Sequence, residues 1–349
     1  MSFIDQTGMI VDAESLSGEA IGEKPIGRER EISLLQGALG PLREGMSSAH
    51  VWLYGPSGSG KTMLARWVVN EMYLAGETRV GVYVNCWQHR SLYSVATAII
   101  DELKILGAEA QDTTVKLERI RQVLRERPFV VILDEIDRTL PSQREEILYG
   151  LLSLQKTGLI CIATSTQALS QMDERVRSRL SPVIIPLPAY SSYEIEAILT
   201  DRALRALAPG SWSPSVLRQI AEGASGDARL AIQLLRQAAA DAEQAGSAKL
   251  ALKFIDNNLR QWQVICSEAQ LAPLSEHEKI ILELVKQHTP IGSTELAGLY
   301  VAYCRDKNLQ PMARRTFTKY LSRLIAGGMV NAVSGPASRG GRQLRAPPI

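Results

Sequence analysis

The 349-residue chain lacks several features that would place it among membrane, secreted or metal-binding proteins. No apolar run approaches the ~18 residues of a membrane-spanning helix. The N-terminus has no basic segment followed by an apolar core, which a secretory signal would show. The four cysteines form no C-x-x-C pair, and the four histidines show no metal-ligand spacing. We therefore expect a cytoplasmic protein that makes no contact with membranes and keeps its cysteines reduced.

A second absence concerns acidic residues near the C-terminus. Residues 311–349 contain no Asp or Glu, although the net charge of the whole chain is only +2. A segment with charge of one sign indicates an acidic partner, and nucleic acid is the first candidate. The basic residues of this segment are Arg314, Arg315, Lys319, Arg323, Arg339, Arg342 and Arg345.

Residues 55–62 read GPSGSGKT, which is the G-x-x-x-x-G-K-[ST] pattern of a phosphate-binding P-loop. A short apolar strand at 51–54 and a helix at 63–72 supply the context that this motif requires. Its glycines let the backbone wrap phosphates, and Lys61 is expected to reach the β- and γ-phosphates. A chance glycine-rich turn is the alternative. The predicted ATP/ADP contacts here are Gly55, Pro56, Ser57, Gly58, Ser59, Gly60, Lys61, Thr62 and Leu64.

Residues 127–133 read RPFVVIL, a run of mainly apolar and β-branched residues that is typical of a strand buried on both faces. This strand ends in Asp134-Glu135, the Walker B pattern, although an ordinary acidic loop would also fit. Asp134 is expected to hold Mg²⁺ together with Thr62, and Glu135 to polarise the attacking water. Catalytic groups are expected at this place because ligands bind at the carboxyl ends of strands in open α/β sheets.

A further strand at 158–163 ends in polar residues. In P-loop ATPases of the helicase-like kind, a polar side chain beside Walker B positions the water, and Thr164 or Ser165 could do this. A simple loop start is the alternative. With another strand at 183–187, strands alternate with helices along the chain. This alternation predicts an α/β fold with a parallel sheet and helices on both faces.

The chain divides into four predicted parts. A polar, flexible segment precedes the α/β nucleotide-binding domain, and a small helical domain follows it, opening with the capping box S-x-x-E at 191–194. The last part shows three helices and a hairpin, which is the plan of a winged-helix domain. The predicted boundaries of the four parts are 1–24, 25–188, 189–263 and 272–349.

The third helix of the last part, at 313–326, has two different faces. Phe317, Leu321, Leu324 and Ile325 recur as an apolar face, whereas the opposite face is basic and polar. Such a helix can pack on one side and offer hydrogen-bond donors to DNA on the other. A solvated basic face used for protein contacts is the alternative. The predicted DNA-binding residues are Arg314, Arg315, Thr318 and Lys319 on the helix, with Arg339 and Arg342 in the wing.

Several short segments together resemble one family. GRERE at 27–31, VNC at 84–86, LDEID at 133–137, VRSRL at 176–180 and GDAR at 226–229 stand in order before the predicted winged helix. This set resembles the AAA+ replication initiators, meaning the archaeal and eukaryotic family of origin recognition complex subunit 1 and cell division control protein 6. The resemblance covers about residues 25–345. Its P-loop and Walker B are generic, whereas the VNC and GDAR segments are more specific.

The resemblance implies further roles. Arg179 matches the arginine finger, which reaches the γ-phosphate of a neighbouring subunit, although an exposed arginine at a helix end is the alternative. Arg229 matches the second sensor, and Ile26 and Arg28 match the region near adenine. The chain departs from the family in two places. Family members usually carry Asn at the first sensor, where this chain has Thr164-Ser165-Thr166. Their DNA-contacting inserted helix corresponds here to the short stretch 107–116, which contains the acidic residues Glu109 and Asp112.

The expected function is that of an ATP-dependent, DNA-binding replication initiator that is associated with the nucleoid. By resemblance, it recognises duplex DNA at an origin and helps to recruit or load a replicative helicase. ATP binding and slow hydrolysis would act as the switch, within a homo-oligomer or beside another AAA+ subunit. One alternative is an AAA+ regulator or recruitment ATPase of a mobile element or plasmid. A clamp-loader-like ATPase is a third interpretation, although such proteins more often end in a helical collar.

Overall fold

The computed structural model describes residues 8–17, 24–43, 50–76, 81–107, 111–124, 128–271, 274–326, 329–334 and 342–345. The chain divides into two compact units, residues 1–259 and residues 260–349. Within the described ranges, we find no helix with the length and apolar character needed to cross a membrane.

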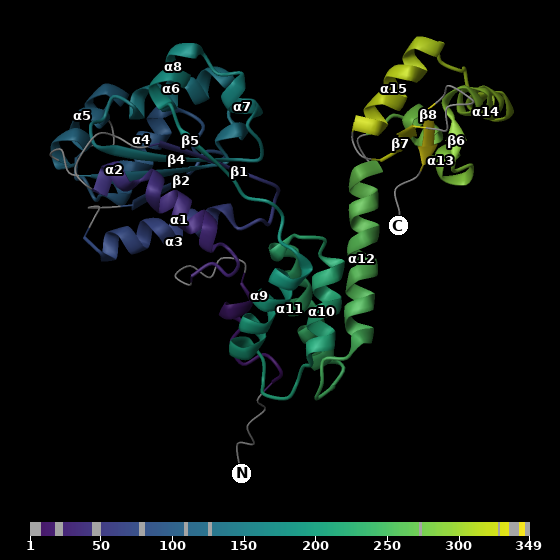
Figure 1. Cartoon of the computed structure of the whole chain (residues 1–349), viewed down its shortest axis with the longest axis horizontal. Helices are drawn as coiled ribbons and strands as arrows, with labels where there is room; N and C mark the ends of the chain where they lie inside the picture. Colours follow the sequence, from purple (N-terminus) through teal and green to yellow (C-terminus); the bar gives the residue numbers. More distant parts are fainter. Residues whose placement is uncertain are drawn as a thin grey trace. The chain divides into compact units, whose positions relative to one another are not determined.

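The first unit is built on a parallel sheet of five strands, as the alternation of strands and helices predicts (Figure 1). The strand order is β2-β3-β4-β1-β5, and each neighbouring pair is parallel. All five carboxyl ends therefore meet at one edge, where the P-loop follows β1 and the Walker B residues end β3. The strands are β1 (His50–Tyr54), β2 (Gly81–Asn85), β3 (Phe129–Asp134), β4 (Thr157–Ala163) and β5 (Val183–Pro186).

Both faces of the central strands β3 and β4 are buried, which explains their unbroken apolar runs. Along β3, Phe129, Val131 and Leu133 pack into one cluster, whereas Val130 and Ile132 pack into another on the opposite face. One face is covered by α4 (Leu92–Glu102), α5 (Thr113–Leu124), α6 (Pro141–Leu151), α7 (Gln167–Ser170) and α8 (Glu174–Leu180). The other face is covered by α1 (Glu29–Ala38), α2 (Gly40–Arg43) and α3 (Lys61–Leu74).

α5 was not predicted from the sequence. It begins within the stretch 107–116, which corresponds to the inserted helix of the family. Within that stretch, Asp112 accepts a hydrogen bond from the backbone N–H of Val115 at 2.9 Å and so caps α5. Glu109 lies outside the described residues. The acidic residue Asp112 therefore has a local structural role at a helix N-terminus.

The helical part of the first unit contains α9 (Ser192–Ala206), α10 (Pro214–Gly223) and α11 (Ala228–Gln244). The predicted capping box is present, since Ser191 and Glu194 exchange hydrogen bonds at the start of α9. The core between these helices is rich in alanine, and Ala203, Ala206 and Ala238 are fully buried. The following helix, α12 (Leu252–Leu271), continues beyond residue 259 into the second unit.

Residues 8–17 differ from the flexible segment that the sequence suggested. Met9 and Leu16 are buried in the core of the helical part, and Leu16 is only 1% exposed. The backbone N–H of Val11 donates to the carbonyl of Ala206 at 2.8 Å, and Ile10 forms an isolated antiparallel bridge with Leu207. The polar composition misled the prediction, because two apolar side chains and these backbone hydrogen bonds are enough to hold the segment.

The second unit contains α13 (Glu276–Gln287), α14 (Ser293–Asp306) and α15 (Arg314–Ala326). It also has a small antiparallel sheet in the order β6-β8-β7, made of β6 (Ile291–Gly292), β7 (Asn331–Ser334) and β8 (Arg342–Arg345). The sequence predicts the three helices at about 275–288, 293–306 and 313–326 and the hairpin strands at 329–333 and 342–345, which are close to the observed bounds. β6 was not predicted, because a strand of two residues is too short to show the alternation of apolar and polar residues. The name winged helix stays a prediction for this unit.

The anchoring of the N-terminal segment can be tested with a pair of variants. We expect Leu16→Ala to lower the free energy of unfolding by about 2–5 kcal/mol, because it leaves a cavity in a closed core. Val11→Ala, in the same segment, is the matched control, because Val11 is 64% exposed. Urea unfolding of the full chain would measure both. Equal stability of Leu16→Ala and the wild type would contradict the packing of residues 8–17.

Candidate functional site

The P-loop has a backbone that only glycine can follow at two positions. Gly58 and Gly60 have φ angles of +67° and +88°, in the left-handed region. A Cβ atom at Gly58 would lie 1.9 Å from Oδ1 of Asp227, and one at Gly60 would lie 2.5 Å from the hydroxyl of Tyr190. The loop is thus enclosed by the segments that lead into α9 and α11. Any side chain at these positions would push the helical part away from the loop.

Lys61 bends over this loop. Its Nζ donates to the carbonyl oxygens of Gly55 at 2.8 Å and Pro56 at 2.7 Å. Burial lowers the pKa of Lys61, whereas the carboxylates of Asp134 and Asp137 act in the opposite direction. The ammonium group is therefore partly desolvated and close to the Walker B residues, which suits a cation that meets phosphates.

Asp134 connects the Walker B strand to the P-loop helix. Its Oδ2 accepts from the Thr62 hydroxyl at 2.7 Å and from the Tyr83 hydroxyl at 3.0 Å, and its Oδ1 accepts from the N–H of Glu135 at 2.9 Å. Burial, with the Asp134 carboxylate second, raises the pKa of Tyr83 to about 12, so this hydroxyl keeps its proton. The carboxylate is thus held in one orientation by three donors.

The same oxygens suit a hard cation. Mg²⁺ is usually bound by one or two protein oxygens together with water and substrate phosphates, and Thr62 and Asp134 place a hydroxyl and a carboxylate side by side. Across the described ranges, no group of three or more His, Cys, Asp and Glu side chains forms a separate metal site. Thr62 and Asp134 could therefore hold Mg²⁺, which would neutralise phosphate charge there.

Glu135 and Thr164 follow the neighbouring strands β3 and β4. Glu135 is exposed and has a φ of +54°, a strained conformation that is common at functional positions. The N–H and the hydroxyl of Thr164 both donate to Oδ2 of Asp137, at 2.9 and 2.5 Å. Ser165 differs, because its carbonyl accepts from Trp52 Nε1 at 3.1 Å and its hydroxyl accepts from the N–H of Gln167 at 3.3 Å. Thr164 therefore has the more fixed hydroxyl.

The helical part contacts the P-loop directly through the start of α11. The N–H of Ala228 donates to the carbonyl of Gly58 at 3.2 Å, and the Asp227 side chain caps the helix by accepting from the N–H of Leu230 at 2.9 Å. Arg229, on the first turn, is exposed. The pKa of Lys61 is lowered mainly by burial, and the positive charge of Arg229 lowers it further. The structure thus brings Arg229 and Lys61 to the same site.

Arg28 supports the P-loop from its buried side. Its guanidinium, only 2% exposed, donates to the carbonyls of Ser59 at 3.0 Å and Pro188 at 2.8 Å and lies 3.8 Å from the ring centroid of Tyr190. Ile26 packs against the core of the helical part. Arg28 therefore joins the loop to the connection between the sheet and the helical part.

Leu64, a predicted nucleotide contact, has its side chain in the core instead. Its side chain is fully buried in the core below the loop, and its N–H donates to the carbonyl of Gly60 at 2.9 Å. We therefore assign Leu64 to the core. The sequence reasoning missed Tyr83, Tyr190 and Asp137. Only Asp137 had a visible signal, as the second Asp of LDEID.

Arg179 lies on α8, and its contacts are with α6 and the residue after it rather than with the P-loop or Walker B residues. Its guanidinium lies 4.8 Å from the ring centroid of Tyr149, and it donates weakly to the carbonyl of Leu152 at 3.5 Å. Both Arg179 and Tyr149 are exposed. The structure therefore presents this arginine on the outer surface of the α6–α8 pair.

The predicted DNA-binding helix, α15, is amphipathic as its sequence indicates. Phe317, Leu321 and Leu324 are buried. On the same helix, the predicted DNA-binding residues Arg314, Arg315, Thr318 and Lys319 are exposed. Arg339 lies outside the described residues, and Arg342 begins β8 with a side chain that is not described.

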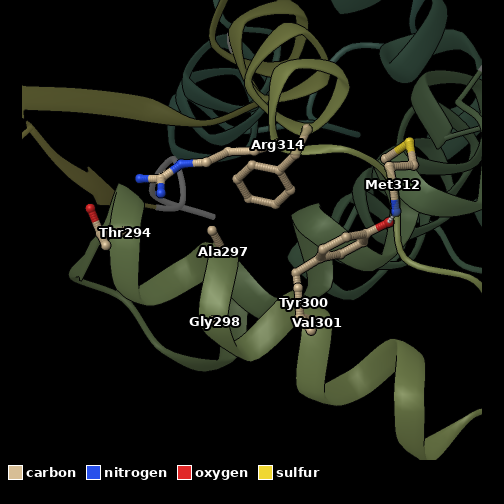
Figure 2. A pocket seen from close by; sticks show the side chains of 8 residues that line it. Thr294, Ala297, Gly298, Tyr300, Val301, Met312 and Arg314 are labelled. Carbon is tan, nitrogen blue, oxygen red and sulfur yellow. Dashed lines mark hydrogen bonds between the residues drawn. The ribbon is translucent and has the colours of Figure 1, made fainter.

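A pocket of about 270 Å³ lies between α14 and the start of α15 (Figure 2). At its base, the Tyr300 hydroxyl accepts from the N–H of Met312 at 3.2 Å and forms a hydrogen bond with Nδ1 of His277 at 2.8 Å. These bonds fix the turn before α15. The lining residues are Thr294, Ala297, Gly298, Tyr300, Val301, Met312, Arg314 and Phe317.

Two known domain families match parts of the chain. Residues 24–162 match the AAA ATPase domain, and residues 196–257 match the Cdc6 AAA+ ATPase-type lid domain. The first range contains the P-loop and the strands up to β4, and the second covers most of the helical part that contacts the loop. The helical part can therefore be called a lid, which the sequence had described only as a small helical domain.

Relatives extend the similarity along most of the chain. The ORC1-type DNA replication protein 1 of Halobacterium salinarum is 32% identical over 88% of this chain and 100% of its own length. The ORC1-type DNA replication protein of Pyrococcus abyssi is 26% identical over 90% of this chain and 81% of its own.

Two solved structures from Aeropyrum pernix are also similar. The ORC2 protein, in ADPNP–ADP complexes, has a TM-score of 0.77 and 26% identity over 97% of this chain and 94% of its own. The ORC1 protein in complex with DNA has a TM-score of 0.63 and 25% identity over 95% and 92%. Both similarities span the first and the second unit.

The nucleotide site can be tested by two substitutions. We expect Lys61→Ala to weaken ATP binding by about tenfold or more, because a charge-assisted contact to phosphate is lost. Glu135→Gln should keep ATP binding and lower turnover by about 10²-fold, since it lacks the carboxylate that polarises water. Fluorescent nucleotide titration and phosphate release would measure these effects, with the exposed Lys104→Ala as the control. Wild-type turnover by Glu135→Gln would show that Walker B is misassigned.

Proposed function

The chain belongs to the family of ORC1-type DNA replication proteins, and we propose that it is an ATP-dependent, DNA-binding initiator of replication. It binds duplex DNA at an origin and helps to recruit or load the replicative helicase. ATP binding and slow hydrolysis to ADP and phosphate act as its switch. The observation that carries this proposal is the similarity to an ORC1-type protein along that protein's whole length, which includes both the ATPase half and the basic C-terminal unit.

The same similarity weighs against the two alternatives. A recruitment ATPase of a mobile element or a clamp-loader-like ATPase would share the P-loop and Walker B, which are generic. It would not be expected to share the lid together with a basic C-terminal unit. Neither alternative has an observation of its own in its favour.

The proposed residue roles combine the sequence motifs with the positions of the side chains. Lys61 meets the β- and γ-phosphates, and Thr62 and Asp134 hold Mg²⁺ beside them. Glu135 polarises the attacking water, and Thr164 or Ser165 orients it. Arg229 approaches the γ-phosphate from the lid. The contact of Ala228 and Asp227 with Gly58 supports this last role, because it fixes the start of α11 against the P-loop.

The lid contact also gives the switch a physical basis. A nucleotide in the P-loop would meet groups from both the sheet domain and the lid. Without a nucleotide, the two cations Arg229 and Lys61 repel each other. A γ-phosphate between them would change this interaction. A ligand can shift a conformational equilibrium only by its differential contacts with the two states. The γ-phosphate supplies such a difference between ATP and ADP.

DNA binding is assigned to the exposed face of α15. Arg315 lies on its first turn, where recognition helices meet base edges, and Lys319 lies one turn further, in a position suited to phosphates. Arg339 and Arg342 would contact DNA from the wing. The similar ORC1 protein of Aeropyrum pernix was solved in complex with DNA, which supports a DNA partner for this chain.

The first prediction from this proposal concerns Arg179. We expect Arg179→Ala to retain ATP binding and to lose hydrolysis, because its contacts leave it exposed for a neighbouring subunit. An arginine finger acts at the nucleotide site of a neighbouring subunit, and it raises the hydrolysis rate by about 10³–10⁵-fold in other nucleotide hydrolases. Mixing Arg179→Ala with Lys61→Ala protein should restore phosphate release. Arg175→Ala, another exposed arginine of α8, is the control. A mixture without recovered hydrolysis would argue against a trans role.

The second prediction concerns DNA. Removing a phosphate contact by Lys319→Ala should lower the slope of log K against log salt by about 1, because fewer counterions are released. Arg315→Ala should cost about 1–3 kcal/mol and relax sequence preference at one position. Fluorescence anisotropy of the full chain at several salt concentrations would measure both.

The matched control for charge alone is Lys286→Ala, which removes an exposed lysine from α13. It should leave the salt slope unchanged. Binding that is insensitive to salt, or equal effects of Lys286 and Lys319, would favour the interpretation of α15 as a surface for protein contacts.

A further inference from the structure

Asp137 and Thr164 form a connected pair at the carboxyl edge of the sheet. Asp137 belongs to a short 3-10 helix, Ile136–Arg138, directly after the Walker B residues, and Thr164 directly follows β4. Because β3 and β4 are neighbours in the sheet, the two segments leave it side by side. The family resemblance gave a role to the position of Thr164 but none to Asp137.

Two hydrogen bonds join the pair at a single oxygen. The Thr164 N–H donates to Oδ2 of Asp137 at 2.9 Å, and the Thr164 hydroxyl donates to the same oxygen at 2.5 Å. A short O–H···O distance is typical of a hydroxyl that donates to an ionised carboxylate. The first bond fixes the backbone of residue 164, and the second fixes the rotation of its hydroxyl.

This arrangement limits what the Thr164 hydroxyl can do. A threonine hydroxyl has one proton to donate and two lone pairs to accept with, whereas an ionised carboxylate only accepts. Since the proton is directed at Asp137, Thr164 has no proton left for an oxygen of the γ-phosphate. Its lone pairs remain available for a donor, and the attacking water is such a donor.

We propose that Asp137 is a positioning residue for ATP hydrolysis, which holds Thr164 so that its hydroxyl accepts a hydrogen bond from the attacking water. This inference rests on the ATPase activity in the proposed function and selects Thr164 over Ser165 as the first sensor. The water oxygen forms the new bond to the γ-phosphorus, and the β–γ bridging P–O bond breaks with its electrons on ADP. The water proton passes to Glu135 and then to the released phosphate. Thr164 gives up no proton in this step.

The surroundings of Asp137 are consistent with this role. Burial lowers the pKa values of Lys61 and Arg144, whereas the negative charge of Asp137 raises both of them. Asp137 is therefore close to both cations. Arg144, on α6, is only 3% exposed. Asp137 thus lies near the lysine of the P-loop as well as next to the sensor threonine.

The test uses the full chain and separates binding from turnover. Thr164→Val should lower the single-turnover rate of ATP hydrolysis by about 10²-fold, and Asp137→Ala by about 10- to 100-fold. Neither substitution should change the nucleotide Kd, because neither side chain binds the phosphates. Thr166→Val, the same change two residues further along, is the control and should have the wild-type rate.

Conservative substitutions supply a readout that a purely structural role would not give. Thr164→Ser retains the hydroxyl and should keep most of the rate. Asp137→Asn retains a carbonyl acceptor and should recover part of the rate that Asp137→Ala loses. The double variant Thr164→Val with Asp137→Ala should be no slower than Thr164→Val alone, because the two residues act as one unit.

Three results would overturn the inference. One is a wild-type rate for Asp137→Ala. Another is a double variant whose rate falls by the product of the two single effects, which would show independent roles. The third is loss of nucleotide binding in Asp137→Ala, which would make Asp137 a support of the loop. In all three cases the wild type still hydrolyses ATP and Glu135→Gln does not, so the proposed ATPase stands. A wild type without hydrolysis would contradict both.

Discussion

The contact between the P-loop and the start of α11 is the constraint on which the rest of the first unit depends. Ala228 donates to the carbonyl of Gly58, and the Asp227 side chain lies where any side chain at residue 58 would have to go. The same short segment caps α11 and starts the turn that carries Arg229. In the proposed switch, a change in the phosphates bound by the loop would therefore act directly on the lid through this contact.

The groups around that contact are fixed by few, well-defined bonds. Arg28 connects Ser59 with Pro188, and Asp134 accepts from Thr62 and Tyr83. Because these hydrogen bonds hold the loop and the Walker B carboxylate in place, the site is preorganised before nucleotide enters. Arg179 is different, since its contacts are weak and exposed. An arginine held in this way can be presented to another subunit with little loss of stability.

Much of this could be predicted from the sequence. The P-loop and the Walker B strand are local patterns, and their alternation with helices predicts the parallel sheet and the position of its carboxyl edge. The amphipathic face of α15 and the capping box at Ser191 are local patterns as well. The roles of Tyr83, Tyr190 and Asp137 could not be derived, because each depends on a partner brought close only by the fold. The packing of Leu16 on the lid was missed for the same reason.

The central claim is that this chain marks replication origins in an ATP-dependent way. The most direct measurement is footprinting of the full chain on fragmented DNA from its own genome, with ATP and with ADP. The account predicts protection concentrated at a replication origin, with a difference between the two nucleotides. Protection spread evenly over the fragments, or the same pattern with ATP, ADP and no nucleotide, would contradict it.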